Sequence, residues 1–144
     1  ENLDAFTQRF LKLAADEIIP EQMTPQIDID AVLDLQDINA KFMSELKKMN
    51  PFGPDNQKPV FCSLGVKDYG TSKLVGKDLE HIKLELIDDK SNTPIHGIAF
   101  GMHQHNTHIK NMKPFNICYT IEENTYNGNT SLQLMVKDIK ENDI

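Results

Sequence analysis

The chain has 144 residues, of which 39% are hydrophobic and 26% are charged, as expected for a globular domain with its own core. It contains no tryptophan and no apolar run approaching the ~18 residues of a membrane-spanning helix, so the sequence excludes such a helix. The formal net charge of −7 at pH 7 argues against a chain that binds nucleic acid over its whole surface. No secretory signal is visible, and because the chain begins at Glu1 rather than Met, we interpret it as a fragment of a longer protein.

Charge is unevenly distributed along the chain. Residues 1–57 carry 5 basic and 11 acidic side chains, whereas residues 58–144 carry 10 basic and 11 acidic ones. Within residues 58–121, 8 lysines outnumber 6 acidic residues. The C-terminal part therefore has a weakly basic region, which is compatible with modest binding of a polyanion.

An amphipathic helix is predicted at the start of the chain. Apolar residues recur at three- and four-residue spacing from Leu3 to Ile18, and Pro20 is expected to end the helix. Its apolar stripe needs a surface to cover it, which we expect a domain outside this chain to supply.

A strand and a second helix are predicted next. Alternation in residues 26–35 predicts a half-buried strand, with Asp28 and Asp30 on its solvent face. A metal site built on these two acids is the alternative, and the period-2 spacing explains them without one. Asp37 is the expected N-cap of a helix that runs to about Met49.

Residues 51–61 separate the helical pattern from a strand pattern and contain three prolines and a glycine. Pro51 cannot continue a helix, Gly53 can adopt positive φ, and residues 54–56 have turn chemistry. The stretch predicts a rigid connection into a β domain, with a ligand-facing loop as the alternative.

Five short strands are predicted after this connection. They cover residues 60–76 (interrupted at Gly65 and at residues 68–70), 82–86, 95–100, 115–121 and 132–139. A polar stretch without clear period, residues 101–113, separates the third strand from the fourth, and Asn127-Gly128 predicts a hairpin turn. The predicted fold class is mainly β with N-terminal helices: a five-stranded OB-fold barrel preceded by a helix-strand-helix linker region.

Several short motifs occur in an order that is more specific than any one of them. They are PFGPDN at 51–56, PVF at 59–61, VGKD at 75–78, HIK at 81–83, IAFG at 98–101, and LQL at 132–134 preceded by Asn124, Tyr126 and Gly128. Together they resemble the C-terminal part of RecJ-type single-stranded-DNA-specific exonucleases over most of residues 20–140. Asp55 stands where that family usually has glycine, and aspartate tolerates turn geometry.

The resemblance implies a three-part organisation. Residues 1–19 correspond to the C-terminal helix of a preceding accessory domain, residues 20–57 to a linker strand and helix that end in the PFGPDN turn, and residues 58–144 to the OB-fold barrel. It also implies that this fragment is the single-stranded-DNA-binding module of a 5'-to-3' exonuclease and that the module positions DNA for a catalytic core. The DHH domain that holds Mn or Mg in the family has no counterpart here, so we expect no catalytic residue, metal ligand or cofactor in this fragment.

An OB barrel binds single strands with cations along the phosphates and aromatic side chains under the bases. The predicted phosphate or sugar contacts are Lys73, Lys77, His81 and Lys83, and the predicted stacking platforms are Tyr69 and Tyr126. The alternatives are that the lysines only keep the surface soluble and that the tyrosines only cap the core.

Two further groups of residues have side chains that can bind metals or react. His103, His105 and His108 lie in the polar stretch without a cysteine or carboxylate among them, so we expect no zinc site there. Cys62 and Cys118 lie in apolar, strand-like settings and are expected to be reduced core residues. Reduced cysteines favour a cytoplasmic protein.

The expected partner is single-stranded DNA, and no membrane contact is expected. The alternative hypothesis is a protein-interaction module that docks a partner such as single-strand-binding protein. The low content of basic residues suits that alternative.

Overall fold

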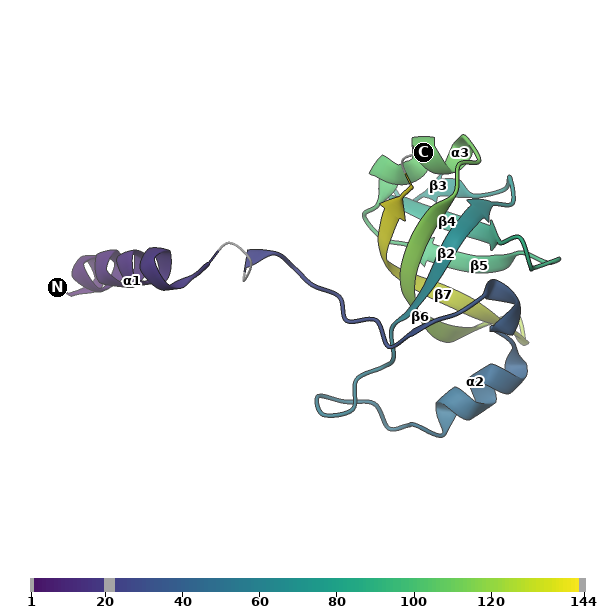
Figure 1. Cartoon of the computed structure of the whole chain (residues 1–144), viewed down its shortest axis with the longest axis horizontal. Coiled ribbons are helices and arrows are strands. Elements are labelled where there is room, and N and C mark those ends of the chain that lie inside the picture. The colour runs from purple at the N-terminus through teal and green to yellow at the C-terminus, as the bar shows by residue number, and fades with distance from the viewer. Residues whose placement is uncertain (1, 20–22, 143–144) are drawn as a thin grey trace.

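Seven strands form one sheet that closes into a barrel in the computed structural model, which describes residues 2–19 and 23–142 (Figure 1). The strands are β1 (Ala31–Val32), β2 (Phe61–Asp68), β3 (Lys73–Val75), β4 (His81–Ile87), β5 (Ile95–Ala99), β6 (Phe115–Tyr126) and β7 (Asn129–Glu141). Their order is β1-β2-β6-β7-β5-β4-β3, and an additional pairing of β2 with β4 closes the ring. The ring of β2, β4, β5, β7 and β6 confirms the predicted five-stranded OB-fold barrel.

Period-2 alternation explains why these segments are strands. In β4 every second residue from Ile82 to Leu86 is fully buried, and the residues between them face outward. β6 and β7 form a long antiparallel hairpin whose turn, Asn127-Gly128, has positive φ at both residues, as predicted.

The barrel core is centred on Tyr119 in β6, which is fully buried and packs against Phe61 in β2 with ring centroids 6.4 Å apart. The hydroxyl groups of Tyr119 and Ser63 lie 2.7 Å apart, and Ser63 donates to the carbonyl oxygen of Leu33 at 2.7 Å. This chain of hydrogen bonds ties β6 and β2 to the segment that follows β1.

Residues 101–113 contain helical structure that the sequence pattern did not predict. They form the 3-10 turn η3 (His103–His105) and the short helix α3 (Asn106–Lys110). Ile109 is fully buried and anchors this segment to the barrel. A five-residue helix with one apolar anchor leaves too short a pattern for its period to be recognised.

The first helix, α1, spans Leu3–Glu17, close to the predicted bounds. None of its residues is buried, and Phe6 and Phe10 remain 65% and 59% exposed. Pro20, predicted to end the helix, lies outside the described residues. No described helix is long and apolar enough to cross a membrane.

The linker differs from the prediction in two places. Of residues 26–35 only Ala31–Val32 form a strand, which pairs in parallel with β2, and Ile27 and Ile29 are exposed rather than half-buried. Helix α2 (Ala40–Lys47) is capped by Asn39, whose side chain accepts hydrogen bonds from the backbone N–H groups of residues 41 and 42. Asp37, the predicted cap, belongs instead to the 3-10 turn η2 (Leu35–Asp37).

The PFGPDN turn is held by Asn56. Its side-chain amide donates to the carbonyl oxygens of Met49 at 2.8 Å and Pro51 at 2.9 Å, and its backbone pairs with that of Gly53. Gly53 does not have the positive φ that the sequence suggested, and neither does Asp55. Asp55 therefore fits this turn without backbone strain.

Candidate nucleic-acid interface

Strands β3, β4 and β5 present one continuous outward surface, which we call the β3–β5 outer face. Backbone register places Lys73 opposite Lys83, Lys83 opposite Ile98, and Val75 opposite His81. The outward residues of this face are Lys73, Val75, His81, Lys83, Glu85, His96 and Ile98, with Phe100 directly after β5. Five of the six predicted contact residues lie on it or beside it, and only Tyr126 does not.

Lys73 and Lys83 are exposed cross-strand neighbours. Two like charges placed opposite each other destabilise a sheet unless something of opposite charge lies between or over them. In the described part of the chain neither lysine makes an ion pair, and the same holds for Lys77 in the turn between β3 and β4. Of the other described lysines, six pair with acidic partners on the same or another element, and five make no ion pair either: Lys12, Lys41, Lys113, Lys137 and Lys140. The unpaired lysines are therefore available to a phosphate.

His81 is fixed by three contacts. Its Nδ1 accepts a hydrogen bond from the backbone N–H of Gly101 at 3.0 Å, and its Nε2 lies 3.2 Å from a carboxylate oxygen of Glu80. Its ring packs edge-on against Phe100, with centroids 4.9 Å apart. Both ring nitrogens are engaged, so the His81 ring is better placed to support an aromatic platform than to contact a phosphate.

Phe100 is a candidate binding residue that the sequence interpretation missed. It is 55% exposed at the end of β5, next to His81. The sequence contained no clear signal, because Ile98 and Phe100 are both large and apolar, whereas in the structure the small Ala99 is fully buried and strand alternation turns Phe100 outward. An exposed aromatic ring of this kind offers a surface on which a base can stack.

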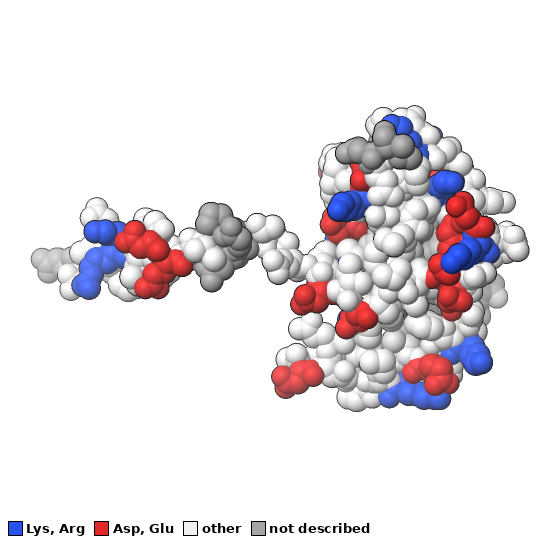
Figure 2. Space-filling view, viewed as in Figure 1, with Lys and Arg blue, Asp and Glu red and all other residues white. Residues whose placement is uncertain are grey.

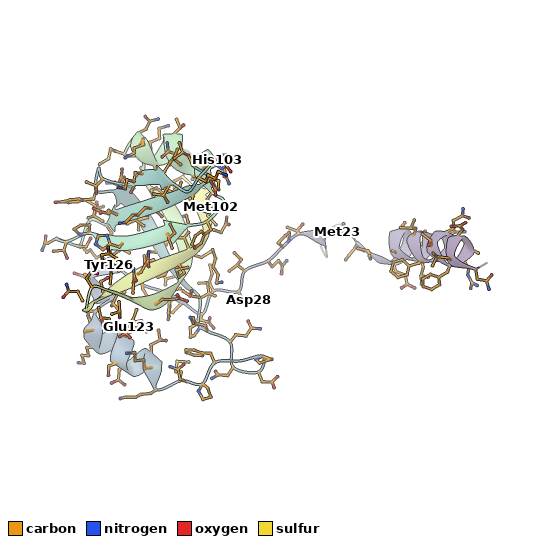
Figure 3. All side chains as sticks on the ribbon, turned by 180° about the vertical axis from the view of Figure 1, so that it is seen from behind. Met23, Asp28, Met102, His103, Glu123 and Tyr126 are labelled. Atoms are coloured by element: carbon orange, nitrogen blue, oxygen red, sulfur yellow. The ribbon has the colours of Figure 1, made fainter. Side chains whose placement is uncertain are left out.

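The two predicted tyrosines lie in different places. Tyr69 is 52% exposed, and its backbone N–H donates to the carbonyl oxygen of Glu85 at 2.8 Å, which puts it beside the β3–β5 outer face. Tyr126 is 75% exposed near the tip of the β6–β7 hairpin, which extends past the Ile95 end of β5. In Figure 3 it lies at the end of the barrel opposite Met102 and His103, so it is remote from Lys77.

Acidic side chains reduce the positive charge of the β3–β5 outer face. Glu85 lies on the outer face, where it is hydrogen-bonded to Thr71 and lies 3.6 Å from His96. Figure 2 shows the face on which β2 and β6 lie in front, not the β3–β5 outer face, and acidic and basic side chains are interleaved there as well. The geometry favours a few discrete contacts over a broad electrostatic groove.

Asp68 supports this region from inside the barrel. It is fully buried at the end of β2, accepts a hydrogen bond from the backbone N–H of Ser72 at 3.1 Å, and lies 3.5 Å from the ammonium group of Lys110. Burial alone would raise the pKa of Asp68, but hydrogen bonds from Ser72 and Gly70 and the charge of Lys110 outweigh it and lower the pKa. Asp68 is therefore held as a buried carboxylate.

The histidines of residues 101–113 have a structural role. His105 and His108 both lie beside Glu141 of β7, with nitrogen-oxygen distances of 2.7 Å and 3.2 Å. They join η3 and α3 to the end of the barrel, whereas His103 is exposed. Among the described residues no group of three His, Cys, Asp or Glu side chains is arranged to hold a metal ion.

Curated relatives are similar over nearly the whole chain. The single-stranded-DNA-specific exonuclease RecJ of Haemophilus influenzae is 24% identical over 140 residues, and that of Bacillus subtilis is 24% identical over 139 residues. These alignments cover 97% and 96% of this chain but only 24% and 17% of the relatives. The chain thus spans about a quarter or less of the relatives' length.

A solved structure has the same fold. The crystal structure of RecJ in complex with Mn2+ from Thermus thermophilus superimposes with a TM-score of 0.74 at 17% identity, over 99% of this chain and 20% of that one. The family described as the RecJ OB domain matches residues 29–138. This chain therefore belongs to the RecJ OB domain family.

Proposed function

We propose that this chain is the single-stranded-DNA-binding module of a RecJ-type 5'-to-3' exonuclease and positions DNA for a catalytic core elsewhere in the full-length protein. The observation that carries the proposal is the pair of unpaired lysines, Lys73 and Lys83, next to exposed aromatic rings on the β3–β5 outer face. Both curated relatives are named as single-stranded-DNA-specific exonucleases, which supports the substrate class.

The proposed binding mode assigns different tasks to the residues of this face. A phosphate bridges Lys73 and Lys83 and relieves their mutual repulsion, while Lys77 contacts the backbone at the edge of the face. Bases stack on Phe100, supported by His81, and on Tyr69. No residue of the chain is assigned a catalytic task.

We extend the proposal to the rest of the full-length protein. Residues 1–19 are the last helix of an accessory domain, whose surface covers the exposed apolar stripe of α1. Residues 20–57 are the linker and residues 58–144 the barrel. The catalytic core, which needs Mn or Mg, lies in the remaining length, and the protein works in the cytoplasm.

Docking of single-strand-binding protein remains a prediction that no contact in the described residues favours. A pull-down with the acidic C-terminal tail of that protein separates it from direct DNA binding. Capture of the tail by a chain that binds no oligonucleotide would favour docking over the function proposed above.

The first test removes the paired cations. Replacing both Lys73 and Lys83 with alanine is expected to weaken binding of a fluorescent single-stranded oligonucleotide about tenfold at low salt, because a phosphate loses both of its cationic partners. The slope of the logarithm of the binding constant against the logarithm of the salt concentration should become shallower by about 0.7 for each phosphate that is no longer neutralised. Fluorescence anisotropy measures both quantities.

The matched control for this test is Lys41→Ala, which removes an exposed lysine of α2 away from the outer face. It is expected to leave the affinity within about twofold of the original. Equal weakening by the control, or no binding by the unmodified chain even at low salt, would contradict the proposed function.

The second test concerns stacking. Phe100→Ala and Tyr69→Ala are each expected to cost about 1–3 kcal/mol of binding free energy with little change in salt dependence, because they remove an aromatic surface and no charge. The variant Tyr126→Ala tests whether the bound single-stranded DNA reaches the β6–β7 hairpin. If Phe100→Ala binds the oligonucleotide as tightly as the unmodified chain in the anisotropy measurement, Phe100 is not part of the binding mode.

A further inference from the structure

Cys62 and Cys118 are 56 positions apart in sequence and are paired directly in the sheet. Cys62 of β2 lies opposite Cys118 of β6 in an antiparallel ladder. Both are free thiols and both are 8% exposed. The sequence predicted reduced core cysteines, and their direct juxtaposition follows only from the strand register.

The backbone around the pair has the geometry that a disulfide needs. The carbonyl oxygen of Cys62 accepts a hydrogen bond from the backbone N–H of Leu33 at 2.8 Å, on the β1 side of β2. The N–H and C=O of one strand residue point the same way, so those of Cys62 turn away from β6. The cysteines therefore form a non-hydrogen-bonded pair, for which the Cα atoms are roughly 4.5 Å apart, within the range that disulfides span.

Both side chains also lie on the same side of the sheet. Phe61 and Ser63 point into the core, where Ser63 contacts the Tyr119 hydroxyl, so alternation turns Cys62 outward. Cys118, next to the inward Tyr119, is turned outward in the same way. The two residues line one cavity of about 560 Å³, together with Ile27, Ile29, Lys137 and Lys140.

We propose that Cys62 and Cys118 are a redox-sensitive pair that closes into a cross-strand disulfide when the protein is exposed to a peroxide. In the first step the sulfur of one cysteine attacks hydrogen peroxide, so that an S–O bond forms, the O–O bond breaks and water leaves. In the second step the other sulfur attacks this sulfenic acid, so that the S–S bond forms, the S–O bond breaks and a second water leaves. Two thiols are oxidised and one peroxide is reduced to two waters.

The two steps differ in speed. Burial raises the pKa of both thiols, and for Cys118 the charge of Asp138 and the neighbouring Cys62 add to this effect. Because the thiolate is the nucleophile, the first step is slow at neutral pH and accelerates as the pH rises. In the second step the partner residue is already opposite in the ladder, so the sulfur of Cys118 has only to leave its contact with the carbonyl oxygen of Asp138, 3.9 Å away. We expect this step to outrun oxidation to sulfinic acid.

The test treats the 144-residue chain with hydrogen peroxide and counts free thiols after denaturation. We expect both thiols to be lost together, the intact mass of the monomer to fall by two hydrogen atoms, and the reaction to accelerate with pH. The oxidised chain should unfold at a higher Tm until a reductant is added, because the bond closes a loop between residues 62 and 118.

Two single variants, Cys62→Ala and Cys118→Ala, keep one thiol each and serve as matched controls. Neither should lose two hydrogen atoms or gain Tm on treatment. The proposal is overturned if the two thiols of the unmodified chain stay titratable, if each is oxidised to sulfinic acid independently, or if the only disulfides join separate chains on a non-reducing gel. Since the cysteines lie on β2 and β6, oligonucleotide binding by the β3–β5 outer face should be unchanged by oxidation.

Discussion

Replacing Tyr119 with alanine is expected to lower the free energy of unfolding by about 3–5 kcal/mol, as for other large aromatic residues removed from a core. Tyr119 is fully buried, packs against Phe61, and donates a hydrogen bond to Ser63 across two strands of the ring. The cavity left behind lies where β2 and β6 meet, so the surroundings cannot collapse without moving the sheet. Chemical denaturation of the chain measures the loss.

Tyr119→Phe separates the hydroxyl from the ring. Because Ser63 already donates its proton to Leu33, it accepts from Tyr119, and the phenylalanine variant removes only that donor. We expect a loss of about 1 kcal/mol, the usual net value of one hydrogen bond. Equal losses for the alanine and phenylalanine variants would show that ring packing contributes little.

The same residue predicts how stability changes at alkaline pH. Burial raises the pKa of Tyr119 to about 12 from an ordinary value of 10.0. Between these values the unfolded chain releases the phenolic proton and the folded chain keeps it, so stability falls as the pH rises through this window. The expected loss is roughly 2–3 kcal/mol, and Tyr119→Phe should remove it from the denaturation profile.

Alternation in the sequence was sufficient to predict which side of β4 and of β6 faces the core, but not of β2, where the alternating set Val60, Cys62 and Leu64 points away from the core and Leu64 is exposed. Phe115, Ile117, Tyr119 and Ile121 alternate with polar or small residues, and all four are buried in β6. The closed ring, by contrast, depends on pairings between β5 and β7 and between β2 and β4. These long-range pairings leave no local pattern, and the resemblance to a known family supplied them.

The errors in the linker have a tertiary cause. The backbone N–H of Leu35, at the start of the 3-10 turn η2, donates to the carboxylate of Asp88, 53 residues away, at 2.7 Å. That turn occupies the position where Asp37 was expected to start a helix, and Asn39 becomes the cap. Both residues are good caps, so the local sequence could not choose between them.

The candidate interface was predictable only residue by residue. Lys83 lies between two buried strand residues, so alternation turns it outward. Its position opposite Lys73, and the separation of Tyr126 from both, depend on strand register and hairpin length. Single residues of the site could therefore be predicted from the sequence, whereas the grouping of those residues could not.

The second large effect is expected at Asp68. Replacing this buried carboxylate with asparagine keeps its shape and removes its charge. We expect the free energy of unfolding to fall by about 1–3 kcal/mol at neutral pH, because the backbone N–H of Ser72 loses a charged acceptor. The lowered pKa of Asp68 contributes stability above the ordinary aspartate pKa, and this contribution is lost as the pH falls through the folded value. The Asp68→Asn variant should therefore show a flatter decline in stability below about pH 4.

Asp68 also fixes the proposed binding face from inside the barrel. It holds Ser72, whose hydroxyl oxygen accepts from the backbone N–H of Glu85 at 2.9 Å, and these contacts set the turn between Tyr69 and Lys73. Asp68→Asn is expected to weaken oligonucleotide binding several-fold under conditions where the variant is fully folded, because a displaced turn moves Tyr69 and Lys73 out of position.

Lys110→Ala is the matched control, since it removes the ion pair and leaves the hydrogen bonds from Ser72 in place. If Asp68→Asn binds as tightly as the unmodified chain, the turn does not position the interface, and if Lys110→Ala weakens binding equally, charge rather than hydrogen bonding sets its geometry.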